Sequence, residues 1–237
     1  MRQFFIFGWM MVCALAASAQ ETGALMELPE GGFAPQGSGF RVTFRLANMK
    51  RVSPRVTDPP LGKWQAGMEW SDGHGVRARL EICLVKRSVG LSTEDVTLVA
   101  ARLLVANPTG HPWSTSLSVE IAPDNAIYAL AVDRHAFFIE GRPVLVADSP
   151  SRGAILADAP FAVRPLTPQE RAHVESAKGE CRGEMIYDVA LNAGQTLRLG
   201  FVSPVHVPKG EEPDLDYYRA FSVEDLFAQA ERDAARK

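Results

Sequence analysis

Five acidic side chains stand at predicted turns and strand ends, where a hydrolase that acts on sugars would need its catalytic residues. They are Asp124, Asp133, Glu140, Asp148 and Asp158. Glycoside hydrolysis needs two carboxyl groups held roughly 5–10 Å apart. The spacing of these residues defines no such pair, and acidic turn residues usually accept local backbone hydrogen bonds. We therefore predict no catalytic residue, and keep a sugar-active enzyme that uses these turn carboxylates as an alternative.

The histidines do not have the spacing of a metal site. H-x-H and H-E-x-x-H do not occur, and Asp72 with His74 is the closest approach to a cluster. Those two residues lie in a glycine-flanked tip, where turn formation explains both. Nucleophile and phosphate-binding signatures such as G-x-S-x-G are also missing. The sequence therefore predicts neither a metal site nor a cofactor.

Three tryptophans, Trp64, Trp70 and Trp113, are the candidate ligand-binding residues. A sheet face or a loop rim can bind carbohydrate with a few aromatic plates and polar groups. Trp113 closes the loop NPTGHPW, and we expect it to be the most exposed of the three. The structural alternative is that these indoles belong to the core, as most tryptophans in sandwiches do.

The first residues are typical of a signal peptide. Arg2 precedes an apolar run from Phe4 to Leu15, and Ala17-Ser18-Ala19 offers a small-residue cleavage site. The run is shorter than the stretch of about 20 residues that a bilayer-spanning helix needs. We predict cleavage after Ala19, a periplasmic or extracellular location, and no membrane-spanning segment in the mature protein.

Two cysteines, Cys83 and Cys181, remain when the leader is removed with Cys13. An oxidising compartment allows a disulfide between them. The alternative is a buried thiol in the strand-like run around Cys83 and a surface thiol in the polar stretch around Cys181. The sequence leaves both possibilities open.

The charge pattern bears on the partners. The net charge is −3, and the basic residues form no patch or arginine-rich run, so nucleic acid is not an expected partner.

Side-chain alternation predicts one all-β domain over residues 40–210, after a loosely held lead-in at 20–39. Between Phe40 and Leu46 apolar residues alternate with cationic and polar ones, whereas residues 96–106 are apolar on both faces, as in an interior strand. Further strands are predicted at 64–70, 76–85, 117–121, 127–132 and 154–163, with hairpins over 136–147 and between 185–191 and 196–202. About ten or eleven strands at this spacing indicate a large antiparallel β-sandwich.

Two segments have helical signals. The T-P-Q-E sequence at 167–170 is a capping box with proline at the first helical position, and it predicts a short helix over 168–178. Ser222 is placed to cap a second helix, within a C-terminal linker and helix at 211–237. The apolar stripe of this helix consists of Val223, Leu226, Phe227 and Ala230.

Several of these segments resemble a known domain when they are read in order. The sequences LLVANPTGHPW, LSVEIAP and AFFIEGRPVLVAD, and then VALNAGQTLRLGFVSPV, are similar to the β-sandwich that precedes the helical barrel in six-hairpin glycosidase-like proteins. Asn107, Thr109 and the F-I-E-G at 138–141 stand in comparable places. The C-terminal LDYYRAFSVEDLFAQAERDAARK resembles the helical linker to that barrel. The resemblance covers roughly residues 40–237.

The resemblance implies a function without catalysis in this chain. Such families carry their catalytic carboxylates in the barrel, and this sequence stops at Lys237 before a barrel begins, so no catalytic residue can be transferred. The leading hypothesis is an exported, non-catalytic β-sandwich module of a carbohydrate-active, glycoside hydrolase-like protein. Its expected partners are a polysaccharide or a helical-barrel catalytic domain.

A second hypothesis comes from a different class. A free-standing envelope protein would use its sandwich to bind another protein. That hypothesis predicts a contiguous exposed apolar patch of several hundred Å².

Overall fold

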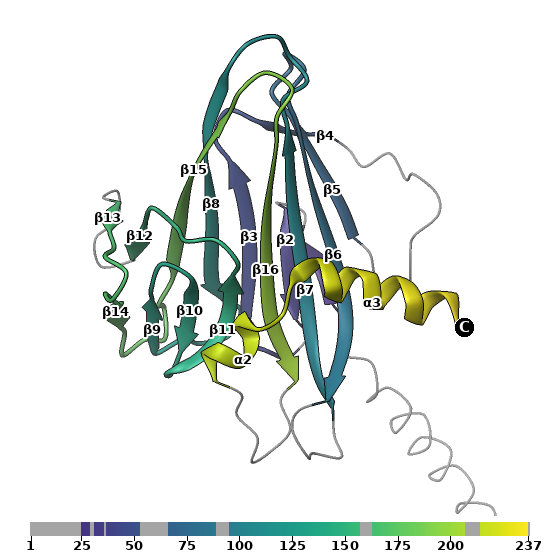
Figure 1. The fold of residues 1–237 in the computed structure, drawn as a ribbon. Helices are drawn as coiled ribbons and strands as arrows, with labels where there is room; N and C mark the ends of the chain where they lie inside the picture. The colour runs from purple at the N-terminus through teal and green to yellow at the C-terminus, as the bar shows by residue number, and fades with distance from the viewer. Residues whose placement is uncertain are drawn as a thin grey trace, which may run out of the picture.

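Two antiparallel sheets form the body of the protein in the computed structural model (Figure 1). The structure describes residues 25–28, 31–35, 37–52, 66–88, 95–156, 163–206 and 214–236. The predicted signal peptide at 1–19 lies outside these residues.

Within the described residues the small sheet has seven strands and the large sheet has nine. The small sheet contains, in spatial order, β1 (Leu25–Leu28), β2 (Gly32–Pro35), β3 (Phe40–Leu46), β8 (Trp113–Pro123), β15 (Gly183–Leu191), β12 (Gly153–Leu156) and β13 (Arg164–Pro165). The large sheet contains β14 (Ala172–Glu175), β9 (Ala129–Val132), β10 (Ala136–Ile139), β11 (Arg142–Ala147), β16 (Thr196–His206), β7 (Asp95–Ala106), β6 (Arg77–Ser88), β5 (Ala66–Ser71) and β4 (Lys50–Val52). The predicted all-β sandwich is confirmed, although the described strands are more numerous than expected.

Aromatic side chains join the two sheets at the centre of the core. Phe44 from the small sheet meets Phe201 from the large sheet edge to face, with ring centroids 5.2 Å apart. Tyr187, also from the small sheet, packs against Phe201 at 6.0 Å. All three side chains are buried. Edge-to-face pairs of this kind stabilise a core beyond the burial of their apolar area.

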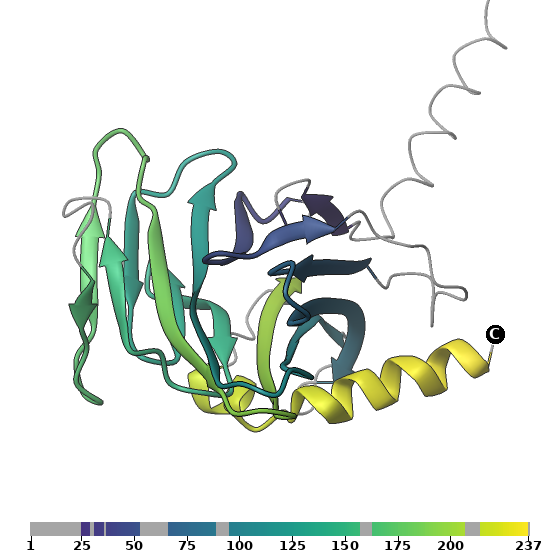
Figure 2. The same ribbon diagram turned by 90° about the horizontal axis from the view of Figure 1, so that it is seen from above.

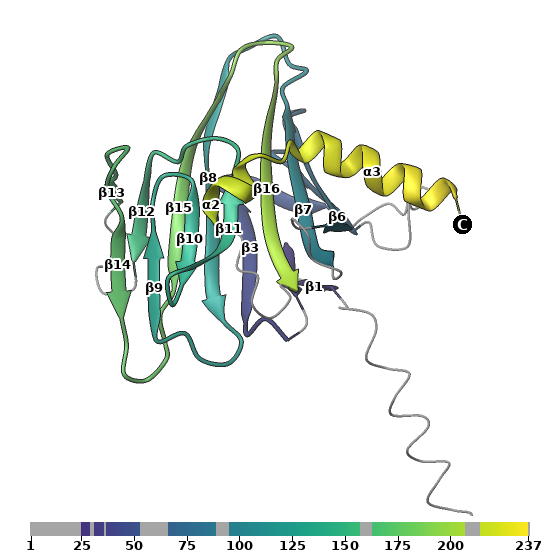
Figure 3. The same cartoon turned by 60° about the horizontal axis from the view of Figure 1, so that its bottom comes forward.

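Part of the outer face of the large sheet is buried as well. Helix α3 (Val223–Ala235) lies across β16, β7 and β6 (Figures 2 and 3). Its buried residues Val223, Leu226 and Phe227 pack on an apolar layer that includes Leu98 of β7. The other face of β7 belongs to the core between the sheets. This arrangement confirms the predicted interior strand and the predicted C-terminal helix, which begins after Ser222.

A short helix, α2 (Leu215–Arg219), precedes α3 and was not predicted. Asp214 caps it and accepts a hydrogen bond from the Tyr217 amide at 2.9 Å.

The prediction of a hairpin between 185–191 and 196–202 is wrong. These segments form β15 and β16, which follow each other in sequence but lie in different sheets. β15 pairs with β8, while β16 pairs with β7. The turn at 192–195 therefore crosses from one sheet to the other, beside the loop that connects β7 to β8. Local alternation marks both strands correctly, but pairing with longer neighbours decides the sheet to which each belongs.

Asn107 connects these two crossing loops. Its side chain is fully buried, and its Nδ2 donates hydrogen bonds to the carbonyl oxygens of His111 at 2.8 Å and Asn192 at 3.2 Å. Its Oδ1 accepts from the Thr109 amide at 3.1 Å. The backbone of Asn107 also bonds to Gln195 and Gly194. The Asn107 side chain thus provides hydrogen-bond partners for backbone groups of both loops, where the chain crosses between the sheets.

The predicted helix at 168–178 is also wrong. The Glu170 amide does donate a hydrogen bond to the Thr167 carbonyl oxygen at 3.1 Å, but this bond closes a single turn and no helix follows. The next residues form β14, in which Ala172 and Val174 are buried and alternate with exposed residues. β14 pairs with β9. A segment with so few apolar residues cannot build a helical stripe, whereas two alternating positions are enough for an edge strand.

The lead-in predicted at 20–39 contributes two strands instead. β1 and β2 extend the small sheet beyond β3, and Phe33 is fully buried. A Cβ atom at Gly32 would lie 2.0 Å from the Val42 carbonyl oxygen, so this pairing requires glycine. The glycine content that suggested a loose segment in fact permits close strand contact.

The predicted hairpin over 136–147 is confirmed as β10 and β11. Glu140 and Gly141 both have positive φ angles, of 51° and 82°, in its tight turn.

We predict that Asn107→Ala lowers the free energy of unfolding by about 3 kcal/mol, because several buried backbone groups lose their partner. Denaturant unfolding followed by circular dichroism measures the change. The matched control is Asn192→Ala in the same corner, where the side chain is exposed and the change should stay within about 0.5 kcal/mol. Equal effects of the two substitutions would contradict the assigned role of Asn107.

Candidate functional site

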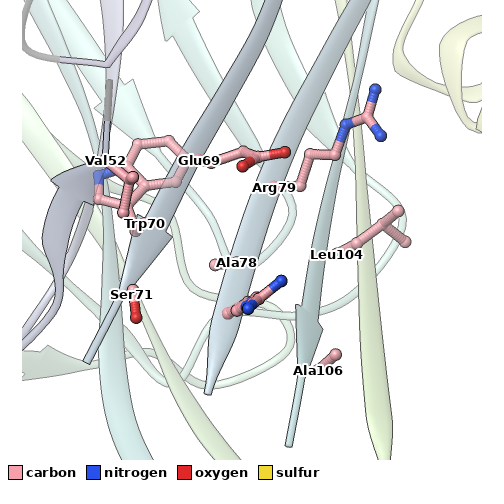
Figure 4. A pocket seen from close by; sticks show the side chains of 9 residues that line it. Val52, Glu69, Trp70, Ser71, Ala78, Arg79, Leu104 and Ala106 are labelled. Carbon is pink, nitrogen blue, oxygen red and sulfur yellow. The ribbon is translucent and has the colours of Figure 1, made fainter. Parts of the chain in front are cut away.

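A groove lies on the outer face of the large sheet, over the parts of β4 to β7 that α3 does not contact (Figure 4). We call it the β4–β7 groove. It encloses about 480 Å³. Its lining residues are Val52, Glu69, Trp70, Ser71, Arg77, Ala78, Arg79, Leu104 and Ala106.

Strand register places the polar rim and the apolar surface of this groove side by side. Val52, Glu69, Arg79 and Leu104 follow one another across β4, β5, β6 and β7. Figure 4 shows the Glu69 side chain extending toward the strand that carries Arg79. Since side chains alternate along a strand, these residues point away from the core that holds Met68 and Leu80. The groove therefore combines an apolar surface with a carboxylate and guanidinium groups.

Of the three tryptophans, the structure places one in this groove. Trp70 is 5% exposed and belongs to the core, so only a small part of its indole is available to a ligand. Trp113 is half-buried, packs against the core and lines neither of the grooves described here. Trp64 lies outside the described residues. The structure thus does not bring the three indoles together.

The sequence did not identify the charged residues of the groove. Arg77, Arg79 and Glu81 alternate with the apolar positions of β6, and this pattern marks an outward face. Any solvated strand has such a face. Only the register with β5 and β7, and the course of α3, show which part of it stays open.

A second hollow lies beside α2, and we call it the α2 groove. It encloses about 500 Å³ and includes His135, Asp148, Tyr218, Arg219 and Phe221. Burial raises the pKa of Tyr218, so its phenol is neutral. The lining of this groove has one carboxylate, Asp148, and one guanidinium group, Arg219, which itself pairs with Asp216.

Three of the five turn carboxylates are held by neighbours. Asp133 accepts the His135 amide at 2.7 Å, and Asp148 accepts the Gly200 amide at 2.9 Å. Asp124 pairs with Arg41 at 3.4 Å. Glu140 occupies the β10–β11 turn described above, and Asp158 lies outside the described residues. These contacts fit the local hydrogen-bonding role expected of acidic turn residues.

Cys83 and Cys181 are separate buried thiols. Cys83 lies under α3, in the layer on the outer face of the large sheet, whereas Cys181 belongs to the core between the sheets. Burial raises the pKa of the Cys83 thiol to about 12. Among the described residues, three or more His, Cys, Asp or Glu side chains nowhere gather as a metal site would require.

Neither a protein-family model nor a curated protein matches this chain. In the described part of the chain, every helix is too short or too polar to cross a membrane.

We predict that two thiols of the protein without its leader react with a thiol reagent when the protein is unfolded in denaturant without reductant. In the folded protein almost no thiol should react. The folded thiols are buried, and at neutral pH a thiol with a pKa of about 12 is almost entirely protonated and unreactive. Absorbance of the released chromophore counts them, and a reduced sample sets the full value. If thiols appear only after reduction, Cys83 and Cys181 are joined and the structure is wrong at this point.

Proposed function

We propose that this chain is an exported, non-catalytic β-sandwich module of a carbohydrate-active protein, and that it holds a polysaccharide along the β4–β7 groove. The observation that carries the proposal is the composition of this groove. Apolar surface from Val52 and Leu104 lies next to Glu69, Arg77 and Arg79 on an open sheet face.

Sugar chains suit such a surface. A pyranose ring presents C–H groups on its faces and hydroxyls around its edge, so it needs apolar contact next to donors and acceptors. Guanidinium groups offer several N–H donors in a fixed plane, and a carboxylate accepts from hydroxyls. Grooves of about 300–1,000 Å³ with a few placed polar groups are typical ligand sites. The β4–β7 groove is within this size range at about 480 Å³.

Two further features support the proposal. The confirmed sandwich with a helix after its last strand agrees with the architecture that the resemblance to six-hairpin glycosidase-like proteins implies. The leader-like first residues agree with export, where polysaccharides are encountered.

The exposed apolar residues favour a glycan over a protein partner. In the described part of the chain the exposed large apolar side chains are Val52, 44% exposed, and Tyr128, 53% exposed. Val52 ends β4 at one edge of the large sheet, whereas Tyr128 precedes β9, near its other edge. Two separate residues do not make the contiguous apolar patch that a protein-binding sandwich would expose.

We predict that the purified chain binds soluble polysaccharides and that Val52→Ala with Leu104→Ala weakens this binding at least about fivefold, because apolar contact with the sugar face is lost. Affinity electrophoresis against a panel of neutral and acidic polymers identifies a ligand, and isothermal titration calorimetry then measures its Kd. A reducing-sugar assay on the same mixtures should show no product.

The matched control is Tyr128→Ala, which removes the other exposed apolar side chain and should leave the affinity unchanged. Thermal melts check that each variant is folded. Binding to no polymer of the panel, or an equal loss in the control, would contradict the proposal. Release of reducing ends would show that the chain is an enzyme.

A further inference from the structure

The charges around the β4–β7 groove are unevenly distributed. Three neighbouring rows of residues cross the large sheet on its outer face: Val52–Glu69–Arg79–Leu104–Arg198, Lys50–Ser71–Arg77–Ala106–Thr196 and Gly67–Glu81–Arg102–Gly200. These rows and the first turn of α3 contribute five basic side chains, Lys50, Arg77, Arg79, Arg102 and Arg198. The carboxylates among them are Glu69, Glu81, Glu224 and Asp225. Five basic against four acidic side chains give this face a small positive charge, although the whole chain has a net charge of −3.

Two of the carboxylates are each shared between two guanidinium groups. Glu81 binds Arg79 at 3.2 Å and accepts from Arg102 Nε at 2.9 Å. Glu224 of α3 binds Arg102 and also Arg198, the latter at 3.2 Å. Because Arg102 is a partner of both carboxylates, three guanidinium groups share two negative charges, and this cluster keeps one positive charge.

The Lys50–Ser71–Arg77 row, at one side of the three, supplies the cations that make no ion pair within the described part of the chain. Lys50 and Arg77 flank Ser71 on adjacent strands, and neither makes an ion pair with any described residue. Both side chains are exposed. An anionic group placed over Ser71 would meet an ammonium on one side and a guanidinium on the other. Guanidinium groups bind carboxylates and other oxyanions through paired, charge-assisted hydrogen bonds.

We infer that the β4–β7 groove selects an acidic polysaccharide, in which sugar units bear a carboxylate or a sulfate. This inference rests on the proposed function and specifies its ligand class. The apolar surface of Val52 and Leu104 contacts the sugar ring, and the Lys50–Ser71–Arg77 row binds the anionic group. The α2 groove lacks this excess charge, since its lining contains one carboxylate, Asp148, and one guanidinium group, Arg219.

The test compares polymers that differ only in charge. Polygalacturonate and its methyl ester share one backbone, and isothermal titration calorimetry measures the Kd of each for the purified chain. We expect the acid to bind at least about tenfold more tightly at low salt, and its advantage to shrink as sodium chloride is added. Chondroitin sulfate against unsulfated chondroitin provides the sulfate arm.

The substitution Arg77→Gln should weaken binding of the preferred acid about threefold to tenfold, because one charge-assisted contact is lost. Binding of the ester should change little. The matched control is Arg182→Gln, since Arg182 is also exposed and without an ion pair to any described residue, at the opposite end of the sandwich. Both guanidinium groups are at the surface, so both variants should fold.

The outcomes separate this inference from the proposed function. Equal affinity for the acidic and esterified polymers, or binding of neutral polymers alone, would overturn the acidic preference and leave glycan binding standing. Binding of polyglutamate as tight as that of polygalacturonate would show a site for any polyanion and overturn both. Absence of binding to every sugar polymer would likewise overturn both.

Discussion

Burial of the central strands of the large sheet on both faces is the constraint on which the rest of the structure depends. Its inner face packs on the small sheet through the contact between Phe44 and Phe201, and its outer face packs under α3 through Val223, Leu226 and Phe227. Strands such as β7 must then be apolar on both sides. Glu224 adds ion pairs that tie the first turn of α3 to β7 and β16.

The extent of that helix decides where a ligand can bind. α3 covers β16, β7 and β6 near its buried residues, and no other described helix or strand covers the outward positions of β4 to β7 beyond it. The residues of β6 nearest the helix are apolar, such as Cys83 and Val85, whereas Arg77 and Arg79 farther along the same strand are charged. The outer side of β6 therefore packs under α3 at one end and lines the candidate binding groove at the other.

Local patterns predicted most of the strands, the β10–β11 turn and α3, because alternation and helical periodicity depend only on neighbouring residues. These patterns did not predict which strands pair over long distances in the sequence. β15 and β16 look like a hairpin, but Asn107 and the pairings with β8 and β7 divide them between the sheets. Of the candidate tryptophans, Trp70 lines the groove. Arg77 and Arg79 were not predicted, because only the position of α3 on the sheet distinguishes an uncovered charged face from a covered one.

The most direct test of the central claim, that the β4–β7 groove is the binding surface, is to map a bound oligosaccharide by amide chemical shifts. Titration of the ¹⁵N-labelled chain with an oligogalacturonide should move the signals of residues 50–52, 69–71, 77–79 and 104–106. Signals of His135 and Arg219 in the α2 groove should stay in place. Shifts confined to the α2 groove or to the small sheet would contradict the account.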